Sequence, residues 1–527
     1  MIRQSSSLER RSSRFAALVA ALALAPVGAW SAEPLVDAAR ANDAAAALAA
    51  LEAGGSADAQ APDGTTALHW AVYNGNQPLV ERLIAAGADV RRANRFGATP
   101  MSEAATAGHA GIIAALLDAG ADVESPAADG QTALMMVART GRVDAARLLL
   151  DRGADPNARE AWRGQTALMW AAAQRQPAMV SLLLEHGADP DARSTASNWP
   201  RQVTAEPRRM YRPFGGLTPL LLAAREGCLD CVRRLLDGGA NPDLVDPKGV
   251  TPLFLAIDNF HFDIAKVLIE AGANPNKWDW WGRTPLYSAV DLNPLPPGGR
   301  ADRPSVDETT SLEIIELLLA AGANPNVQLK LYPPWRLIGD DRGCDSMLTT
   351  GATPLLRAAK TFDADAIRVL LAHGARTDIP NEGGITPVMA AAGLGSVECD
   401  PRGYGPGIPH YLAHDVEERS IEALELLLAG GADINARTTS GRAGARAAGR
   451  TALFGAAFWG WSEVAQYLIE HGARIEVADQ QGLTAVDSAM GRAGGHGRGS
   501  TIEVFEDTAE LLERLCAEQA GCTLPGA

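Results

Sequence analysis

The chain has 527 residues, hydrophobic side chains at 47 % of its positions and a formal net charge of −16. A chain of this length exceeds what one compact core holds, so it predicts several domains or a repeating architecture. Acidic side chains outnumber basic ones, so the chain has no excess positive charge with which to displace the counterions of a nucleic acid. This argues against nonspecific nucleic-acid binding.

The first 32 residues form a separate segment. Arginines within the first 14 positions precede an apolar run from Phe15 to about Ala25, and small residues follow as far as Ala32. This order is typical of an export signal with its cleavage site, and the run is short for a membrane span. We therefore expect residues 1–32 to be a cleaved signal peptide and the mature protein to be periplasmic or secreted. An uncleaved N-terminal anchor is the alternative.

From residue 33 onward a landmark recurs, a threonine followed by proline or alanine and then by an apolar residue. The landmark threonines are Thr66, Thr99, Thr132, Thr166, Thr218, Thr251, Thr284, Thr353, Thr386, Thr451 and Thr484. Most successive landmarks lie 33 or 34 residues apart, and in a regular unit a Gly-Ala pair comes 21 residues after the threonine.

Each unit has its own start and stop signals for helices. Threonine caps a helix N-terminus, proline is tolerated in the first turn, and glycine accepts the left-handed conformation that ends a helix. The pattern therefore predicts two short helices followed by a hairpin. Such a unit cannot bury its own apolar face, so the copies must stack into a solenoid.

The stretch DGTTALHWAVYNGNQPLVERLIAAGADV (63–90) and its copies resemble the ankyrin-repeat family. The resemblance implies an all-α solenoid of about 12 helix-turn-helix units joined by β-hairpin fingers, covering residues 33–518 with a terminal capping unit at 482–518 and a tail at 519–527. It also implies a concave binding face formed by hairpin tips and first helices. The family's usual histidine is present only as His69, which we expect to be structural.

Long spacings mark insertions within single units, because each long gap contains only one Gly-Ala pair that is followed by Asp or Asn. The extended hairpins lie near 194–216, 326–351 and 437–449, and the helix–helix insertions lie near 292–310 and 393–419. The first two hairpins each carry 19 extra residues. Closing a longer loop adds little entropic penalty, so we expect the solenoid to tolerate these insertions.

Aromatic and arginine side chains concentrate in the first two extended hairpins and in the regular hairpin between them. The candidate partner-binding residues are Trp199, Arg201, Arg209, Tyr211, Arg212, Trp278, Trp280, Trp281, Tyr332, Trp335 and Arg336. Tryptophan, tyrosine and arginine dominate interface hot spots. The alternative is that these side chains only pack the hairpins onto their neighbours.

Six cysteines in an exported chain raise the question of disulfides. We favour a Cys516–Cys522 pair, and Cys344 and Cys399 can pair only if two insertions meet. Cys228 and Cys231 form a C-x-x-C at the start of a second helix, where a thiol pKa falls. The fold context of redox enzymes is missing, and Cys231 aligns with the apolar Ile112, so redox catalysis is the minor alternative.

One further pair of side chains bears on catalysis. His410 and His414 are four residues apart and offer a metal site, but no third ligand pattern completes it. We find no other catalytic motif. We therefore expect a monomeric, non-catalytic protein-binding scaffold of the cell envelope, without a cofactor, that recognises a protein partner through its concave face and long hairpins. The alternatives are a small-molecule or glycan binder with a pocket between the two long hairpins, and a metal- or thiol-dependent enzyme.

Overall fold

A computed structural model describes residues 33–127, 129–197, 214–294, 299–300, 303–304, 307–330, 347–395, 415–442, 445–493, 504–519 and 521–524. These residues contain 24 α-helices and one pair of two-residue strands. They divide into two compact parts, residues 1–162 and residues 163–527, which we call the N-terminal unit and the C-terminal unit.

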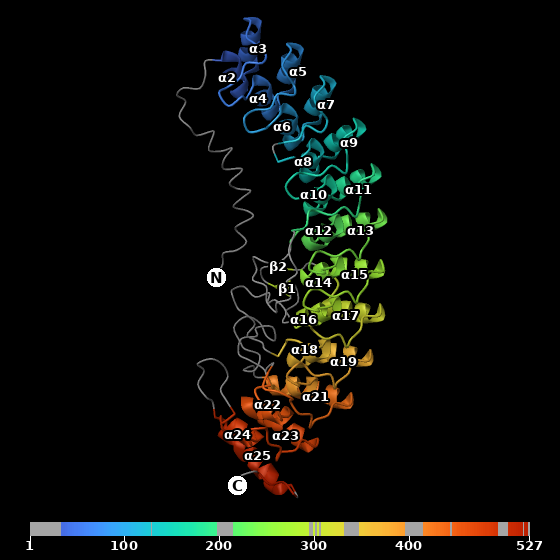
Figure 1. Ribbon diagram of the computed structural model, residues 1–527, viewed down its shortest axis with the longest axis vertical. Helices are drawn as coiled ribbons and strands as arrows, with labels where there is room; N and C mark the ends of the chain where they lie inside the picture. Colours follow the sequence, from blue (N-terminus) through green and yellow to red (C-terminus); the bar gives the residue numbers. More distant parts are fainter. Residues whose placement is uncertain are drawn as a thin grey trace. The chain divides into compact units, whose positions relative to one another are not determined.

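The N-terminal unit holds four helix pairs, in chain order (Figure 1). They are α2 (Pro34–Arg40) and α3 (Ala44–Glu52), α4 (Ala67–Tyr73) and α5 (Gln77–Ala85), α6 (Pro100–Ala107) and α7 (Ala110–Asp118), and α8 (Ala133–Thr140) and α9 (Val143–Asp151).

The C-terminal unit holds eight further pairs. They are α10 (Ala167–Ala173) and α11 (Pro177–Glu185), α12 (Pro219–Glu226) and α13 (Leu229–Asp237), α14 (Pro252–Asp258) and α15 (Phe262–Glu270), α16 (Pro285–Leu292) and α17 (Ser311–Ala320), α18 (Pro354–Lys360) and α19 (Ala364–Ala372), α20 (Pro387–Ala391) and α21 (Val416–Ala429), α22 (Ala452–Trp459) and α23 (Ser462–Glu470), and α24 (Ala485–Ala489) and α25 (Glu506–Glu518). The short strands β1 (Gly299–Arg300) and β2 (Arg303–Pro304) pair antiparallel between α16 and α17. The expected all-α solenoid of helix pairs is confirmed.

The landmark threonines precede the first helix of every pair after the α2–α3 pair, as their capping chemistry predicts. In α14 the hydroxyl of Thr251 accepts a hydrogen bond from the backbone N–H of Phe254 (3.1 Å), and Pro252 occupies the first turn. Thr218 makes the same bond to Leu221 in α12. A hydroxyl in this place satisfies one of the free N–H groups at the helix start. Thr386 and Thr451 make no such bond.

Within the C-terminal unit the helices stack in two columns. First helices pack on first helices, as α12 on α14 and α14 on α16, and second helices pack on second helices, as α13 on α15 (Figure 1). Alanine and leucine side chains fill the space between the columns, for example Leu253, Ala256 and Leu268, each with no exposed surface. Small side chains allow this close helix approach, so the alanine-rich composition serves the stacking.

The fingers between successive pairs differ from the expected β-hairpins. Apart from an isolated bridge between Gln60 and Thr66, the described fingers are built from turns and not from paired strands. Side chains add bonds between successive fingers to those of the backbone: Oδ1 of Asp243 accepts a bond from the N–H of Asn274, and Oδ1 of Asn276 accepts one from the N–H of Asn324. Short polar side chains that bond to nearby backbone explain why Asp and Asn recur after each Gly-Ala pair.

Candidate functional site

The finger that follows α15 carries three of the candidate partner-binding residues. Trp278 is 45 % exposed, and the ammonium of Lys330 lies 3.1 Å from its ring centroid. Trp280 is half-buried, and its backbone N–H donates to the carbonyl of Lys248 in the preceding finger. Trp281 is only 5 % exposed. The finger therefore presents Trp278 outward and holds Trp281 inside the stack.

A buried aspartate decides which tryptophan turns inward. Oδ1 of Asp279 accepts hydrogen bonds from the backbone N–H groups of Trp281 and Arg283, and Oδ2 pairs with the Arg283 guanidinium at 2.7 Å. That guanidinium lies 5.6 Å from the centroid of the Trp281 ring and 4.9 Å from that of Phe254. Trp281 is thus part of a packed cluster, and it acts as a structural residue where the sequence suggested a contact residue.

Most of the other candidate residues lie outside the described residues. These are Trp199, Arg201, Arg209, Tyr211, Arg212, Tyr332, Trp335, Arg336, Cys344, Cys399, His410 and His414. Their partner-binding, disulfide and metal-binding roles stay predictions, and so does a ligand pocket between the two long hairpins.

Three exposed aromatic side chains at finger tips were not among the candidates. Phe96, Trp162 and Phe214 are 64 %, 70 % and 71 % exposed, which is more than Trp278. Each lies one or two residues before the glycine of its finger turn. Trp281 lies at the corresponding place before Gly282 and is buried, so position within the repeat does not by itself identify the exposed aromatic side chains.

The inner face of the first helices forms a second candidate surface. Its residues are the fourth and seventh after each landmark threonine. In the C-terminal unit they build a polar series, because the Ser288 hydroxyl donates to Asp258 (3.0 Å) and Nε of Arg357 donates to Asp291 (2.5 Å). Each bond joins one first helix to the next, so the series runs along the stack from α14 to α18.

Burial along this inner face changes sharply between repeats. At the seventh position Tyr73 in α4 is 52 % exposed and Arg225 in α12 is also exposed, whereas Lys360 in α18 has no exposed surface. Arg357 is likewise fully buried. Among the described residues, no hydrogen-bond partner reaches its Nη1 and Nη2 atoms. A charged group that is buried this deeply requires compensation, which Asp291 supplies at Nε.

Polar side chains from α16, α17 and α19 meet beside this series. Nδ2 of Asn293 donates to the carboxylate of Asp363 (2.7 Å), and the Ser311 hydroxyl donates to Oδ1 of Asn293 (2.6 Å). Burial raises the pKa of Asp363, against the lowering effect of the bonds from Asn293 and from the N–H of Ala366. The cluster links the end of one first helix to the starts of two second helices.

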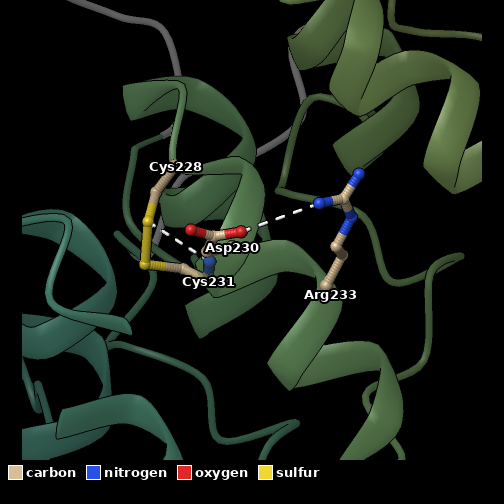
Figure 2. Close-up of a disulfide and its surroundings, with 4 residues drawn as sticks. All are labelled: Cys228, Asp230, Cys231 and Arg233. Carbon is tan, nitrogen blue, oxygen red and sulfur yellow. Dashed lines mark hydrogen bonds and ion pairs between the residues drawn. A yellow bond between two sulfur atoms is a disulfide. The ribbon is translucent and has the colours of Figure 1, made fainter. Parts of the chain in front are cut away.

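Two disulfides lie among the described residues of the C-terminal unit. Cys228 and Cys231 are bonded across the first turn of α13, and the N–H of Cys231 points at Sγ of Cys228 (Figure 2). Beside them Asp230 and Arg233 form an ion pair at 3.7 Å. The second disulfide joins Cys516 to Cys522.

The burial of the Cys228–Cys231 bond bears on redox chemistry. Cys228 is nearly buried and Cys231 is fully buried, with the apolar Val232 and Leu235 beside it on the helix. Thiol–disulfide exchange requires access of an attacking thiolate to sulfur. In the folded state this disulfide is therefore a structural link and not a reactive pair of cysteines.

Among the described residues, no group of three or more His, Cys, Asp or Glu side chains is placed to hold a metal ion. In the same residues, no helix combines the length and apolar character that crossing a bilayer requires.

Comparison with known proteins adds the family relationship. A family model described as ankyrin repeats (3 copies) matches residues 35–127, 120–194, 220–329 and 410–497. Among solved structures, the human ASB11 ankyrin repeat domain is 22 % identical, with a TM-score of 0.37, 45 % of this chain covered and 97 % of that one. The ankyrin repeat domain of Bcl-3, of the IkappaB family, is 27 % identical, with a TM-score of 0.38, 49 % of this chain covered and 99 % of that one. A search of curated proteins gave no match.

Proposed function

The chain belongs to the ankyrin-repeat family, whose repeats generally mediate protein–protein binding, and we propose that it is a non-catalytic protein-binding scaffold of the cell envelope. It acts as a monomer and needs no cofactor. The arginine-rich, then apolar, then small-residue order of positions 1–32 supports export. The acidic net charge of −16 supports a protein partner over a nucleic acid.

The observation that carries the proposal is the exposure of aromatic side chains at finger tips. In the C-terminal unit Phe214 and Trp278 are both exposed, whereas Trp281 at the same finger is buried. Aromatic side chains are enriched at protein–protein interfaces relative to the rest of the surface. Lys330 against the Trp278 ring adds a cation to this tip. A partner with an apolar patch beside an acidic side chain therefore fits it.

The experiment places a photocrosslinking amino acid at single positions of the full-length chain in living cells of its source. At Trp278 and at Phe214 we expect one discrete crosslinked protein, because these tips face the partner. The matched control is Leu268, which has no exposed surface, and we expect no crosslink from it. Equal crosslinking from all three positions, or none from either tip, would refute partner recognition by the fingers.

The location is tested separately. N-terminal sequencing of the mature protein from the envelope fraction should begin just after residue 32. Recovery of the uncleaved chain from the cytoplasmic fraction would contradict export while leaving the crosslinking result intact.

A further inference from the structure

The inner face of the N-terminal unit carries two aromatic side chains on α4 and a carboxylate on α6, which is the next first helix in the stack (Figure 1). Trp70 and Tyr73 are the fourth and seventh residues after Thr66, and Glu103 is the fourth residue after Thr99. Trp70 and Glu103 are half-buried, whereas Tyr73 is exposed. These three side chains lie on helices, away from the finger tips.

One side-chain contact recurs along this face: the seventh residue of one first helix meets the fourth residue of the next. Arg40 follows the N-cap of α2 by seven residues, and its guanidinium lies 5.6 Å from the Trp70 ring centroid. The Thr106 hydroxyl lies 3.5 Å from Sδ of Met136 in the same relation. The side-chain bonds from α14 to α18 repeat it. Successive repeats stack in one register, so this contact is a property of the architecture.

The same register sets Tyr73 of α4 against Glu103 of α6. Tyr73 also packs edge-on against Trp70, with ring centroids 5.8 Å apart and ring planes at 84°. Two perpendicular rings and a carboxylate thus border one patch, which we call the Trp70–Tyr73–Glu103 site. One step earlier along the stack, the chain places its own cation, Arg40, against an aromatic ring. At this step it places an aromatic ring against an acid.

The carboxylate of Glu103 is not neutralised by the described part of the chain. No hydrogen bond or ion pair from a described protein group reaches it. Burial raises the pKa of Glu103, and no neighbouring charge in the described residues offsets this rise. A half-buried carboxylate without a partner destabilises the folded chain. A positive group that binds against it from outside would offset this destabilisation.

We propose that the Trp70–Tyr73–Glu103 site holds a lysine or arginine side chain of the protein partner. The faces of aromatic rings attract cations, and the Glu103 carboxylate supplies the opposite full charge. The net charge of −16 also draws basic segments toward this chain. The inference rests on the proposed function in that the partner is a protein, but it uses the inner face instead of the finger tips.

The openness of the site favours a side chain of a polypeptide over a free amine. Sites for small molecules enclose most of the ligand surface, whereas the Tyr73 ring is 52 % exposed. A cation held from one side gains few contacts, and a polypeptide adds further contacts along the inner face. The isolated side chain should therefore bind weakly but with the charge selectivity of the site.

The experiment is fluorine NMR of the full mature chain labelled with 5-fluorotryptophan, at constant ionic strength. The Trp70 signal is the one that Trp70→Phe removes. The probes are N-acetyl-lysine methylamide, its arginine and norleucine counterparts, and tetramethylammonium. We expect the lysine or the arginine probe to shift the Trp70 signal saturably and the uncharged norleucine probe to leave it in place. The signal of Trp281, which is 5 % exposed, should not move.

Variants connect the shift to the site. Glu103→Gln should weaken binding of the charged probe about tenfold, because a hydrogen bond to a charged group is lost. Tyr73→Leu should weaken it about threefold through the lost ring face. The matched control is Glu52→Gln, an exposed carboxylate of the same unit, which should leave binding unchanged. Glu103→Gln should also unfold at no lower temperature than the wild-type chain, because it removes an uncompensated charge.

Four outcomes would overturn the proposal. The first is the absence of a saturable shift with both charged amino-acid probes. The second is an equal response to norleucine, or equal weakening by Glu52→Gln, because either shows contact without recognition of the charge by this site. The third is tighter binding of tetramethylammonium than of both amino-acid probes, which would make a free amine the occupant. The fourth is a lower unfolding temperature of Glu103→Gln, which would assign the carboxylate a structural role.

These outcomes are independent of the crosslinking at Trp278 and Phe214. Failure of the fluorine NMR test therefore leaves the scaffold proposal intact, and failure of the crosslinking leaves the cation site intact.

Discussion

A single histidine shows how one residue links two repeats. Nδ1 of His69 accepts hydrogen bonds from the backbone N–H and the hydroxyl of Thr66, and Nε2 lies 3.1 Å from the carbonyl oxygen of Ala98 in the next finger. Since a carbonyl only accepts, Nε2 carries the proton and the neutral ring satisfies all three bonds. His69 is buried, as its expected structural role requires.

This arrangement predicts an acid sensitivity of the N-terminal unit. Burial lowers the pKa of His69 below its ordinary value near 6.5, so the unfolded chain binds the proton more readily than the folded one. The neutral ring contributes its full stability above the unfolded pKa, and this contribution falls as pH decreases from about 7 toward 5. We expect His69→Met, the residue at positions 135 and 169, to flatten this loss in urea unfolding. An unchanged pH dependence would contradict it.

The buried ion pair of Arg357 and Asp291 predicts a strong asymmetry between variants. Asp291→Ala leaves a fully buried guanidinium without its carboxylate, and we expect the free energy of unfolding to fall by about 3–5 kcal/mol. The double variant with Arg357→Leu should lose less, because Leu222 and Leu255 occupy the same position in other repeats. Denaturant unfolding measures both.

The control for this pair is an exposed one. Arg368 and Asp365 make an ion pair at 2.6 Å with side chains 54 % and 66 % exposed, and Asp365→Ala should change stability by no more than about 1 kcal/mol. If Asp291→Ala has an effect as small as this, Arg357 is compensated by another group.

At the scale of the helix, two glycines predict opposite effects of one substitution. A Cβ on Gly111 in α7 would meet only the flexible end of Gln77, whereas a Cβ on Gly455 in α22 would meet backbone atoms of Leu394 and Ala392. Alanine is favoured over glycine in a helix by roughly 0.5–1 kcal/mol. We expect Gly111→Ala to raise the melting temperature and Gly455→Ala to lower it markedly. A neutral Gly455→Ala would show that α20 and α22 can separate freely.

The disulfide in the first turn of α13 should contribute only modestly to the free energy of unfolding. Cys228 and Cys231 close a loop of only three residue steps, for which chain-entropy reasoning gives about 2 kcal/mol. We expect the Cys228→Ser and Cys231→Ala double variant to fold with a stability loss of that size. In the native protein, alkylation at these positions should stay slow under mild reduction, because both sulfurs are buried. Fast labelling would favour a reactive thiol pair.

At the scale of the whole molecule, stability depends on neighbouring repeats. The last pair, α24 and α25, covers α22 and α23, and α25 presents acidic residues such as Glu506, Glu510 and Glu513 outward. A polar end repeat keeps a solenoid soluble. A chain that ends at residue 478 should therefore unfold its last remaining repeats at lower denaturant and self-associate. Unaltered unfolding and size-exclusion profiles would contradict a capping role.

Much of the fold was predictable from local chemistry. The landmark threonines identify the starts of the first helices after α2, and the Gly-Ala pairs identify the ends of most second helices, because caps and turns depend on residues within one repeat. The same arithmetic predicts the place of the insertions, which lie largely outside the described residues. The described fingers departed from expectation, since they consist of turns, and side chains such as Asp243 and Asn276 add hydrogen bonds between successive fingers.

The candidate sites were less predictable. Trp278 and Trp281 are three residues apart and of one type, yet Asp279 and Arg283 turn only one of them inward. Arg446 and Gly393 are more than fifty residues apart, and only stacking brings them to the walls of one small pocket beside α22. The repeat pattern does not predict that two residues so far apart in the sequence come together.

The sequence by itself therefore determined the repeat, its helix boundaries and its family, because these depend on bonds between residues close in the chain. The tertiary structure alone decided which aromatic side chains face water, which cations are buried, and where a pocket opens. Those properties arise from side chains of different repeats that meet only after the helices stack, and burial is a property of the stack rather than of any one residue in it.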